Sequence, residues 1–278
     1  MHALQDRIVL ITGGSSGIGR AAAVRLAGCG ARIVIAARRP EPLRETVEEL
    51  RALGAQAHAV TADVAETEQC RRAVEATVDH FGGLDILICS AGVSMRGAFC
   101  DSEPAALEAV MRTNFHGTLY CTLFALPHVR KSRGSLVALS SLVGKRGTPG
   151  YAVYGASKFA IQGLYQSLRV ELAADGVHVG VLAPGFVDTP LRQNVLTPDG
   201  HIWAEPPAIP FRVWPVERCV DCLMRLILKR QSEALLPGFL GPLLALDQAM
   251  GGWLGDRLLG RSFAGAHPPR AVVPSGNV

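Results

Sequence analysis

The sequence predicts an α/β fold, in which a single domain is built on a doubly wound parallel sheet with helices on both faces. Short runs rich in β-branched residues and leucine alternate along the chain with longer helical patterns, an order typical of βαβ units. The short runs are apolar almost throughout, as expected for parallel strands that helices cover on both sides. A length of 278 residues suits one large domain of this type.

The strands and helices are expected in alternation. Strands are predicted at residues 7–11, 32–37, 56–62, 84–89, 135–140, 178–183 and 233–237, and helices at 17–29, 40–54, 66–82, 104–132, 151–175 and 215–231. Parallel strands joined by helices need right-handed crossovers, so the helices should divide between the two faces of the sheet. No low-complexity tract or internal repeat interrupts this pattern, and we assign residues 1–278 to one domain.

Residues 186–214 form an insertion that is too long and too apolar for a plain connector. The segment holds five prolines together with Phe186, Trp203, Phe211 and Trp214. Loops longer than about 12–15 residues in compact domains are usually lids or binding loops. Sheets of this type bind ligands at the carboxyl ends of their strands, so we expect a substrate lid here. Packing of the segment against the core is the alternative.

The C-terminal part, residues 238–278, is expected to be an apolar extension and tail. The stretch 234–255 carries one charge, Asp247, and Pro237 and Pro242 interrupt it. A membrane-spanning helix needs about 20 predominantly apolar residues in regular helix, so the stretch does not predict a transmembrane segment. A subunit contact or a cover over the substrate pocket is expected, and peripheral attachment to a membrane surface is the alternative.

Composition and charge exclude several classes of protein. With 49% hydrophobic and 19% charged residues, the chain is neither disordered nor fibrous. Its net charge of +4 comes from basic residues scattered along the sequence, whereas nucleic-acid binding needs a concentrated basic face. The N-terminus enters a strand by residue 7 without a signal-peptide pattern, so we expect a cytoplasmic protein.

The seven cysteines indicate free thiols in a reducing compartment. Their number is odd and their spacing shows no disulfide framework. Cys219 and Cys222 form a CxxC pair within a helical pattern, but no second cysteine pair or nearby histidine completes a zinc site. No metal is therefore expected.

A glycine loop follows the first predicted strand. Residues 12–19 read TGGSSGIG and lead directly into a helical pattern. Glycines let the chain turn sharply from strand to helix and let backbone N–H groups approach a pyrophosphate at the positive end of the helix. Dinucleotide binding is the prediction for Gly13, Gly17 and Gly19, and a plain tight turn is the alternative.

The end of the second strand favours NADP over NAD. An acidic residue about 20 positions after the glycine loop would bond the adenosine ribose of NAD. Arg38 and Arg39 stand there instead, after two alanines. Guanidinium groups can hold a ribose 2′-phosphate through charge-assisted bonds, so we expect NADP(H) as the cofactor. Solvated arginines at a strand exit are the alternative.

A tyrosine and a lysine are candidates for acid–base chemistry. Tyr154 and Lys158 are four residues apart in a helical pattern, so their side chains share one face. A free tyrosine has a pKa near 10, and a useful general acid or base needs a pKa closer to the working pH. A neighbouring ammonium and the positive nicotinamide of an oxidised cofactor would lower it. Ser141, 13 residues before the tyrosine, ends the fifth predicted strand.

With these motifs the sequence resembles the short-chain dehydrogenase/reductase family, over about residues 6–237. TGGSSGIG matches the cofactor loop of the family, TGxxxGxG. Three further matches follow in family order. Asp63 matches the aspartate that faces the adenine in the family, and the Asn-Ser-Tyr-Lys tetrad of the family is matched by Asn114, Ser141, Tyr154 and Lys158. The segment Pro184-Gly185 followed by Thr189 matches the motif after the sixth strand. The resemblance implies a Rossmann fold.

The resemblance also implies a mechanism and a binding site. Ser141 would bond the substrate oxygen, Tyr154 would transfer a proton, Lys158 would hold the nicotinamide ribose and lower the tyrosine pKa, and Asn114 would hold a water in the proton relay. The cofactor-binding residues expected from it are Gly13, Ser15, Ser16, Gly17, Ile18, Gly19, Arg38, Arg39, Asp63, Val64, Ala91, Gly92, Tyr154, Lys158, Pro184, Gly185, Val187 and Thr189.

The chain departs from the family pattern at two positions. The family usually has NNAG or NAG after its fourth strand, and this chain has Ser90 before Ala91 and Gly92. The change replaces an amide with a hydroxyl, and we expect a local difference without loss of catalysis. Ser16 stands where many NADP-using relatives carry a basic residue, so the 2′-phosphate would depend on Arg38 and Arg39.

The substrate predicted from these features is a hydrophobic ketone or aldehyde and the corresponding alcohol. The aromatic residues of the insertion offer apolar area and few charges. Relatives usually associate through the helices near 104–132 and 151–175, which implies a homodimer or homotetramer. A non-catalytic NADP-binding sensor or scaffold is the alternative function, although such a protein should have lost Tyr154 or Lys158. An epimerase or dehydratase would need a different glycine spacing and a larger C-terminal domain.

Overall fold

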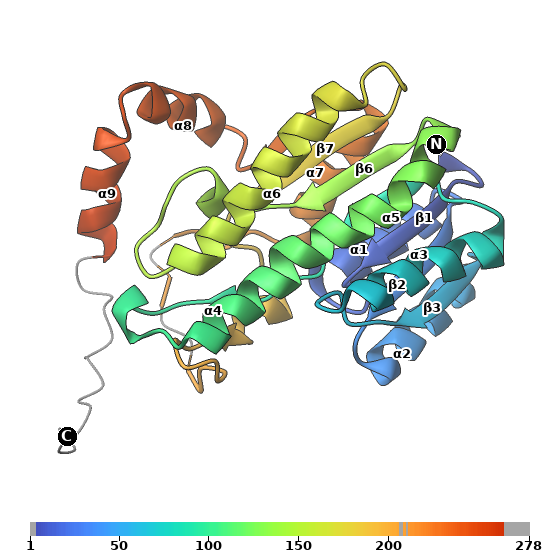
Figure 1. The fold of residues 1–278 in the computed structure, drawn as a ribbon, viewed down its shortest axis with the longest axis horizontal. Coiled ribbons are helices and arrows are strands. Elements are labelled where there is room, and N and C mark those ends of the chain that lie inside the picture. The colour runs from blue at the N-terminus through green and yellow to red at the C-terminus, as the bar shows by residue number, and fades with distance from the viewer. Residues whose placement is uncertain (1–3, 206–207, 210, 264–278) are drawn as a thin grey trace.

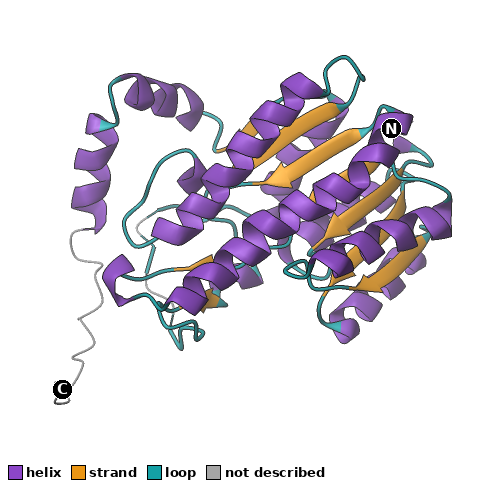
Figure 2. Cartoon of the chain, viewed as in Figure 1, coloured by secondary structure: helices purple, strands orange, loops and turns teal. Residues whose placement is uncertain are grey.

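The computed structural model describes residues 4–205, 208–209 and 211–263 (Figure 1). Its centre is a parallel sheet of seven strands in the order β3-β2-β1-β4-β6-β7-β9 (Figure 2). The strands are β1 (Ile8–Thr12), β2 (Arg32–Ala37), β3 (Ala57–Thr61), β4 (Ile86–Cys89), β6 (Ser135–Leu139), β7 (His178–Pro184) and β9 (Glu233–Leu236). The predicted fold class is confirmed.

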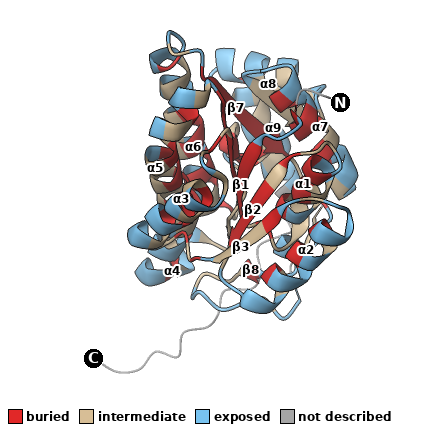
Figure 3. Ribbon diagram, turned by 90° about the vertical axis from the view of Figure 1, so that its right-hand side faces the viewer, coloured by how far each residue is buried: buried red, intermediate tan, exposed pale blue. Residues whose placement is uncertain are grey.

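Helices cover both faces of the sheet, which explains why the strands are apolar along their whole length. On one face lie α1 (Gly17–Ala27), α2 (Pro40–Ala52) and α7 (Val216–Leu228), and on the other lie α3 (Thr67–Phe81), α5 (Gly117–Ser132) and α6 (Ala152–Glu171). Each set packs its apolar residues into one of the two main core clusters. In Figure 3 the strands are buried between the two helical layers.

The structure confirms the helix predicted over residues 104–132, but the helix is not regular throughout. The structure has α4 (Pro104–Met111), a π-helical turn (Arg112–His116) and then α5. The turn holds Asn114, which is fully buried. Single π-helical turns inside helices occur frequently at functional sites. A π-helical turn leaves the helical periodicity of the apolar residues nearly unchanged, so that periodicity could not reveal the turn at residues 112–116.

Several short or C-terminal elements were not predicted. The two-residue strands β5 (Ser94–Met95) and β8 (Val195–Leu196) pair in parallel and fasten the 186–214 insertion to the loop after β4. The C-terminal extension forms α8 (Leu240–Ala249) and α9 (Trp253–Phe263). Residues 264–278 of the predicted tail lie outside the described residues. Within the part of the chain that the structure describes, we find no helix with the length and apolarity needed to cross a membrane.

The strand order indicates that a ligand binds at the carboxyl ends of the central strands. Strand β1 lies between β2 and β4, so the chain winds outward in opposite directions from this point. Ligands of doubly wound sheets bind beyond the carboxyl ends of the strands at such a switch point. The segments that leave these ends are the glycine loop after β1, residues 90–92 after β4, Ser141 after β6 and Gly185 after β7.

Candidate active site

The glycine loop turns tightly between β1 and α1 against the end of β4. Gly13 has φ +68°, and a Cβ atom there would lie 2.8 Å from the backbone of Ala91. A Cβ atom on Gly19 would collide with the carbonyl oxygen of Gly13. The Oγ1 of Thr12 accepts hydrogen bonds from the backbone N–H groups of Ser90 (3.2 Å) and Ala91 (3.3 Å). Glycine is therefore required by close backbone approach, as well as by the turn.

The loop leaves the start of α1 open to a ligand. Ser16 occupies the N-cap position but makes no side-chain cap bond. Gly17 has φ +51°, and a Cβ atom there would lie 3.3 Å from the Cβ of Thr189. The predicted residues after β7 therefore come close to the predicted cofactor loop. Backbone N–H groups at a helix N-terminus, lined by glycine, fit the pyrophosphate of a dinucleotide.

The predicted 2′-phosphate site is open at the carboxyl end of β2. The Nη1 of Arg38 lies 3.9 Å from the Oδ2 of Asp63, and both side chains are partly exposed. Arg39 is the N-cap residue of α2. The backbone N–H of Asp63 donates to Gln69 Oε1 at 2.9 Å, which fixes the loop after β3, and the next residue, Val64, is buried. A long, exposed ion pair is weak, so Arg38 is available to another anion.

Ser141 and Tyr154 come together at the end of β6. Ser141 is the N-cap residue of a 3-10 turn (Leu142–Gly144), and its hydroxyl donates to the carbonyl oxygen of Pro184 at 3.2 Å. The same hydroxyl lies near the phenol of Tyr154, whose pKa it lowers. Lys158 lies one turn further along α6, with its Nζ 5.7 Å from the centre of the Tyr154 ring. The Nζ donates to the carbonyl oxygen of Leu139 at 2.9 Å, which anchors it to β6.

The π-helical turn brings Asn114 to the same place. Its Oδ1 accepts from the N–H of Val93 (2.8 Å), and its Nδ2 donates to the carbonyl oxygen of Val93 (2.9 Å) and to Ser157 Oγ (3.0 Å). A Cβ atom on Gly92 would lie 3.1 Å from Asn114 Oδ1 and 3.6 Å from Lys158 Nζ. Gly92 thus leaves space where the asparagine and the lysine meet. The structure brings all four residues of the predicted tetrad together.

Burial shifts the pKa values of the tyrosine and the lysine in opposite directions. It raises the pKa of Tyr154 to about 12, against the lowering effect of the nearby Ser141 hydroxyl. It lowers the pKa of Lys158 to about 8. Both shifts arise because desolvation disfavours a charged group. The expected lowering of the tyrosine pKa is thus not achieved by the protein alone, and further positive charge at the site is needed.

The aromatic residues of the insertion separate into two groups. Trp203 Nε1 donates to the carbonyl oxygen of Arg96 at 3.0 Å, and Trp214 forms an isolated bridge with Val187 and packs against the core. These contacts fix both tryptophans to the body of the protein. Phe211 instead stacks on Phe186, with ring centres 6.0 Å apart.

Two residues near the site were missed from the sequence. The ring centre of Tyr151 lies 6.2 Å from that of Tyr154 and 6.4 Å from that of Phe186. The guanidinium of Arg96, a buried residue after β5, lies 5.6 Å from the centre of the Tyr151 ring. The position of Tyr151, three residues before Tyr154, was a usable signal, because residues three apart share a helix face. No spacing or motif in the sequence indicated that Arg96 lies near the site.

Two further predicted positions, Gly185 and Ile18, also contact the body of the protein. Gly185 N donates to the carbonyl oxygen of Leu236 at 2.8 Å, and Ile18 packs against the core. Cys219 and Cys222 are buried in α7. Among the described residues, no three histidine, cysteine or acidic side chains gather where they could hold a metal ion.

Comparison with known proteins identifies the family. A sequence model described as short chain dehydrogenase matches residues 7–199. The chain belongs to the short-chain dehydrogenase family. Among curated relatives, 11-beta-hydroxysteroid dehydrogenase 1A of Arabidopsis thaliana is 40% identical over 193 residues, which cover 69% of this chain and 55% of the relative. The chain thus spans little more than half the length of that protein.

Other similar proteins cover more of this chain. 11-beta-hydroxysteroid dehydrogenase-like 6 of Arabidopsis thaliana is 35% identical over 248 residues, covering 86% of this chain and 72% of the relative. A short chain dehydrogenase/reductase of Burkholderia phymatum, solved in complex with NAD, shares the fold with a TM-score of 0.79 and 24% identity, covering 90% of this chain and 95% of that one. Proteins of the family are oxidoreductases that bind a nicotinamide cofactor.

Proposed function

We propose that this chain is an NADP(H)-dependent oxidoreductase that interconverts a hydrophobic ketone or aldehyde and the corresponding alcohol. The observation that carries the proposal is that the Ser141 hydroxyl, the Tyr154 phenol and Lys158 lie together, with the Lys158 Nζ 5.7 Å from the centre of the Tyr154 ring. The two hydroxyl groups can both reach one substrate oxygen. Charge develops on that oxygen during the reaction, so donors already in place stabilise the transition state.

Each residue of the tetrad has a role in this proposal. Ser141 orients the substrate oxygen, and Tyr154 gives it a proton in reduction or removes one in oxidation. Lys158 contributes a buried positive charge beside the phenol, and Asn114 fixes the segment around Gly92. The glycine loop and the start of α1 would hold a dinucleotide, with Arg38 beside its 2′-phosphate. When bound, the nicotinamide supplies or accepts the hydride.

A hydrophobic substrate is supported by the aromatic rings beside the phenol. Tyr151, Phe186 and Phe211 form a row that begins at Tyr154, with successive ring centres 6.0–6.4 Å apart. Such a row offers apolar contact area to a flat ligand. Relatives named hydroxysteroid dehydrogenases favour the same class. We also propose that residues 186–214 act as a lid and that the protein forms a homodimer or homotetramer in the cytoplasm.

The test is a panel of substrates assayed with NADPH and with NADH. Steroid, aryl and long-chain ketones should be reduced, at a rate followed by loss of the reduced-nicotinamide absorbance, and NADPH should be preferred. Water-soluble sugars serve as the contrasting panel. Activity confined to sugars would overturn the substrate class, and absence of turnover with every carbonyl compound, despite NADPH binding, would favour a sensor or scaffold.

A further inference from the structure

The C-terminal helix α8 turns an apolar face to the outside of the protein. Phe239, Leu243, Leu246 and Met250 recur at steps of four, three and four residues, so they form one stripe along the helix. Each is between 48% and 67% exposed, and Trp253 at the start of α9 is 57% exposed. Exposed leucines are common singly, but a contiguous stripe of this kind marks a contact surface.

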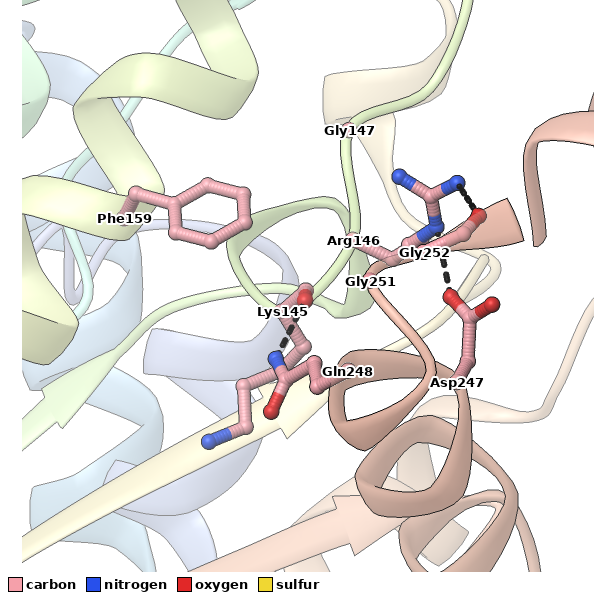
Figure 4. A pocket seen from close by; sticks show the side chains of 8 residues that line it. All are labelled: Lys145, Arg146, Gly147, Phe159, Asp247, Gln248, Gly251 and Gly252. Atoms are coloured by element: carbon pink, nitrogen blue, oxygen red, sulfur yellow. Dashed lines mark hydrogen bonds and ion pairs between the residues drawn. The ribbon is translucent and has the colours of Figure 1, made fainter. Parts of the chain in front are cut away.

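The one charged side chain of α8 is buried, whereas the apolar stripe is exposed. Asp247 is the buried residue of this helix, and its Oδ2 lies 2.8 Å from Nε of Arg146 (Figure 4). Its Oδ1 accepts a hydrogen bond from the N–H of Gly255 at 2.7 Å. A helix that faces water normally has the reverse arrangement, with charges outside and apolar residues inside. The outer face of α8 is therefore suited to an apolar medium.

Specific contacts fix this orientation. Nη2 of Arg146 donates to the carbonyl oxygen of Gly252 at 2.7 Å, and Gln248 Nε2 donates to the carbonyl oxygen of Lys145 at 3.0 Å (Figure 4). A Cβ atom on Gly255 would lie 2.6 Å from Asp247 Oδ2 and would collide with Arg146. The turn between α8 and α9 is thus shaped around one guanidinium. Rotation of the stripe toward the body of the protein would break these contacts.

The exposed charges next to the stripe are Asp256, which pairs with Arg146, and two arginines. Arg146 forms ion pairs with both acidic residues of the two helices, Asp247 and Asp256. The other charged residues of α8 and α9 are Arg257 and Arg261, which are exposed and one helical turn apart. The guanidinium of Arg257 lies 5.8 Å from the centre of the Trp253 ring. Arginine and tryptophan beside an apolar stripe are typical of helices that lie at the surface of an anionic membrane.

We propose that α8 and α9 form a docking surface for a membrane with anionic headgroups. Phe239, Leu243, Leu246, Met250 and Trp253 enter the acyl boundary, and Arg257 and Arg261 meet the headgroups. A second copy of the chain fits less well, because a symmetric contact through this surface would bring like charges together. Both helices lie beyond the carboxyl ends of the strands, the end that also holds the tetrad (Figure 1). Docking would bring that end close to a source of lipid-soluble compounds.

The test is sedimentation of the full chain with lipid vesicles. Vesicles of phosphatidylcholine and phosphatidylserine in equal parts should bind it, and those of phosphatidylcholine alone should bind it less. Leu243→Ser/Leu246→Ser should weaken binding by about tenfold or more, since each leucine loses buried apolar area. Arg257→Gln/Arg261→Gln should weaken binding to the anionic vesicles by about fivefold per arginine. The matched control is Leu53→Ser/Leu228→Ser, which changes two leucines that are 57% and 51% exposed elsewhere.

Three results would overturn the proposal. They are absence of binding to anionic vesicles, equal binding by the Leu243→Ser/Leu246→Ser variant, and equal weakening by the control pair. A smaller mass of that variant in light scattering, with unchanged vesicle binding, would assign the stripe to a second copy of the chain. The thermal midpoint of each variant reports its folding. Turnover of a water-soluble ketone without vesicles tests the proposed catalysis separately, because vesicle binding does not require it.

Discussion

Buried polar side chains lie at both ends of the central sheet, but their hydrogen bonds differ. At the amino end, His178 on β7 has both ring nitrogens bonded, Nδ1 with Ser135 Oγ at 3.1 Å and Nε2 with the carbonyl oxygen of Gln231 at 2.8 Å. At the carboxyl end, the Lys158 ammonium has three N–H groups and, among the described residues, donates to the carbonyl oxygen of Leu139. His178 is thus fully satisfied within the protein, and Lys158 keeps donors for a ligand.

This difference separates stability from function. A polar group whose partners are all within the protein stabilises the fold, and its loss leaves unsatisfied groups behind. A buried group with remaining capacity is costly to the fold and useful to a ligand. Substitutions at the carboxyl end should therefore change turnover or binding more than stability, and substitutions at the amino end should do the reverse.

The largest expected effect is that of Tyr154→Phe. Removal of the phenol hydroxyl should lower turnover by between about 10² and 10⁴-fold, the usual contribution of a general acid or base. The dissociation constant for NADPH and the thermal midpoint should change little, because the ring remains in place. Steady-state rates, fluorescence titration and thermal unfolding measure the three quantities. Tyr120→Phe on α5 is the control, and near-normal turnover in Tyr154→Phe would remove the tyrosine from the mechanism.

The second effect is a change in the pKa of Tyr154 when NADP binds. In the protein alone, burial raises this pKa to about 12. The positive nicotinamide should lower it, because a nearby positive charge favours the phenolate. Alcohol oxidation uses the phenolate as its base, so its rate should rise with pH through the lowered pKa. Tyrosinate absorbance, taken as the difference between the original protein and Tyr154→Phe, measures the pKa with and without NADP. An unchanged value would contradict the proposed role of the cofactor charge.

The sequence predicted the sheet and the tetrad better than the segments between them. The central strands have continuous apolar runs, which indicate their position within a residue or two, and Ser141, Tyr154 and Lys158 are linked by fixed spacings. The pairing of β5 with β8 could not be predicted, because two residues carry no periodicity. The roles of Trp203 and Trp214 depended on which backbone groups happened to lie beside them.

The C-terminal helices illustrate a different limit. The sequence showed that residues 234–255 are apolar and that Asp247 interrupts them. Periodicity reveals that a helix has two faces, but it does not show which face meets the protein. Because charged residues normally lie on the solvent-exposed face of a helix, the sequence would place the side chain of Asp247 in solvent. Arg146, about 100 residues earlier in the chain, reverses that orientation, and only the tertiary structure brings the two side chains together.

The third effect concerns the arginine at the carboxyl end of β2. Arg38→Ala should raise the KM for NADP by about tenfold or more, since a hydrogen bond to a charged group contributes about 1.5–3 kcal/mol. The KM for NAD should stay within about twofold, because NAD lacks the 2′-phosphate. Arg44→Ala, at a more exposed arginine on α2, is the matched control. Equal changes for the two cofactors would show that Arg38 does not contact the phosphate.

The smallest effect is expected at the amino end, where His178 should influence the pH dependence of stability. Burial lowers the pKa of this histidine below the ordinary 6.5, against a raising effect of the Gln231 carbonyl. The unfolded chain therefore takes up the proton more readily, so the stabilisation is complete above about pH 6.5 and is lost as the pH falls through the folded-state pKa. One proton taken up on unfolding changes the free energy by at most about 1.4 kcal/mol per pH unit.

Substitution of this histidine should flatten that dependence without affecting catalysis. His178→Gln should lose less stability than the original protein between neutral and mildly acidic pH, as measured by urea unfolding. His201→Gln, at an exposed histidine of the insertion, should keep the original slope. The kcat of His178→Gln at neutral pH should match that of the original protein. A large loss of turnover together with an unchanged pH slope would contradict the separation between the two ends of the sheet, since a group satisfied entirely within the fold would then be serving the reaction.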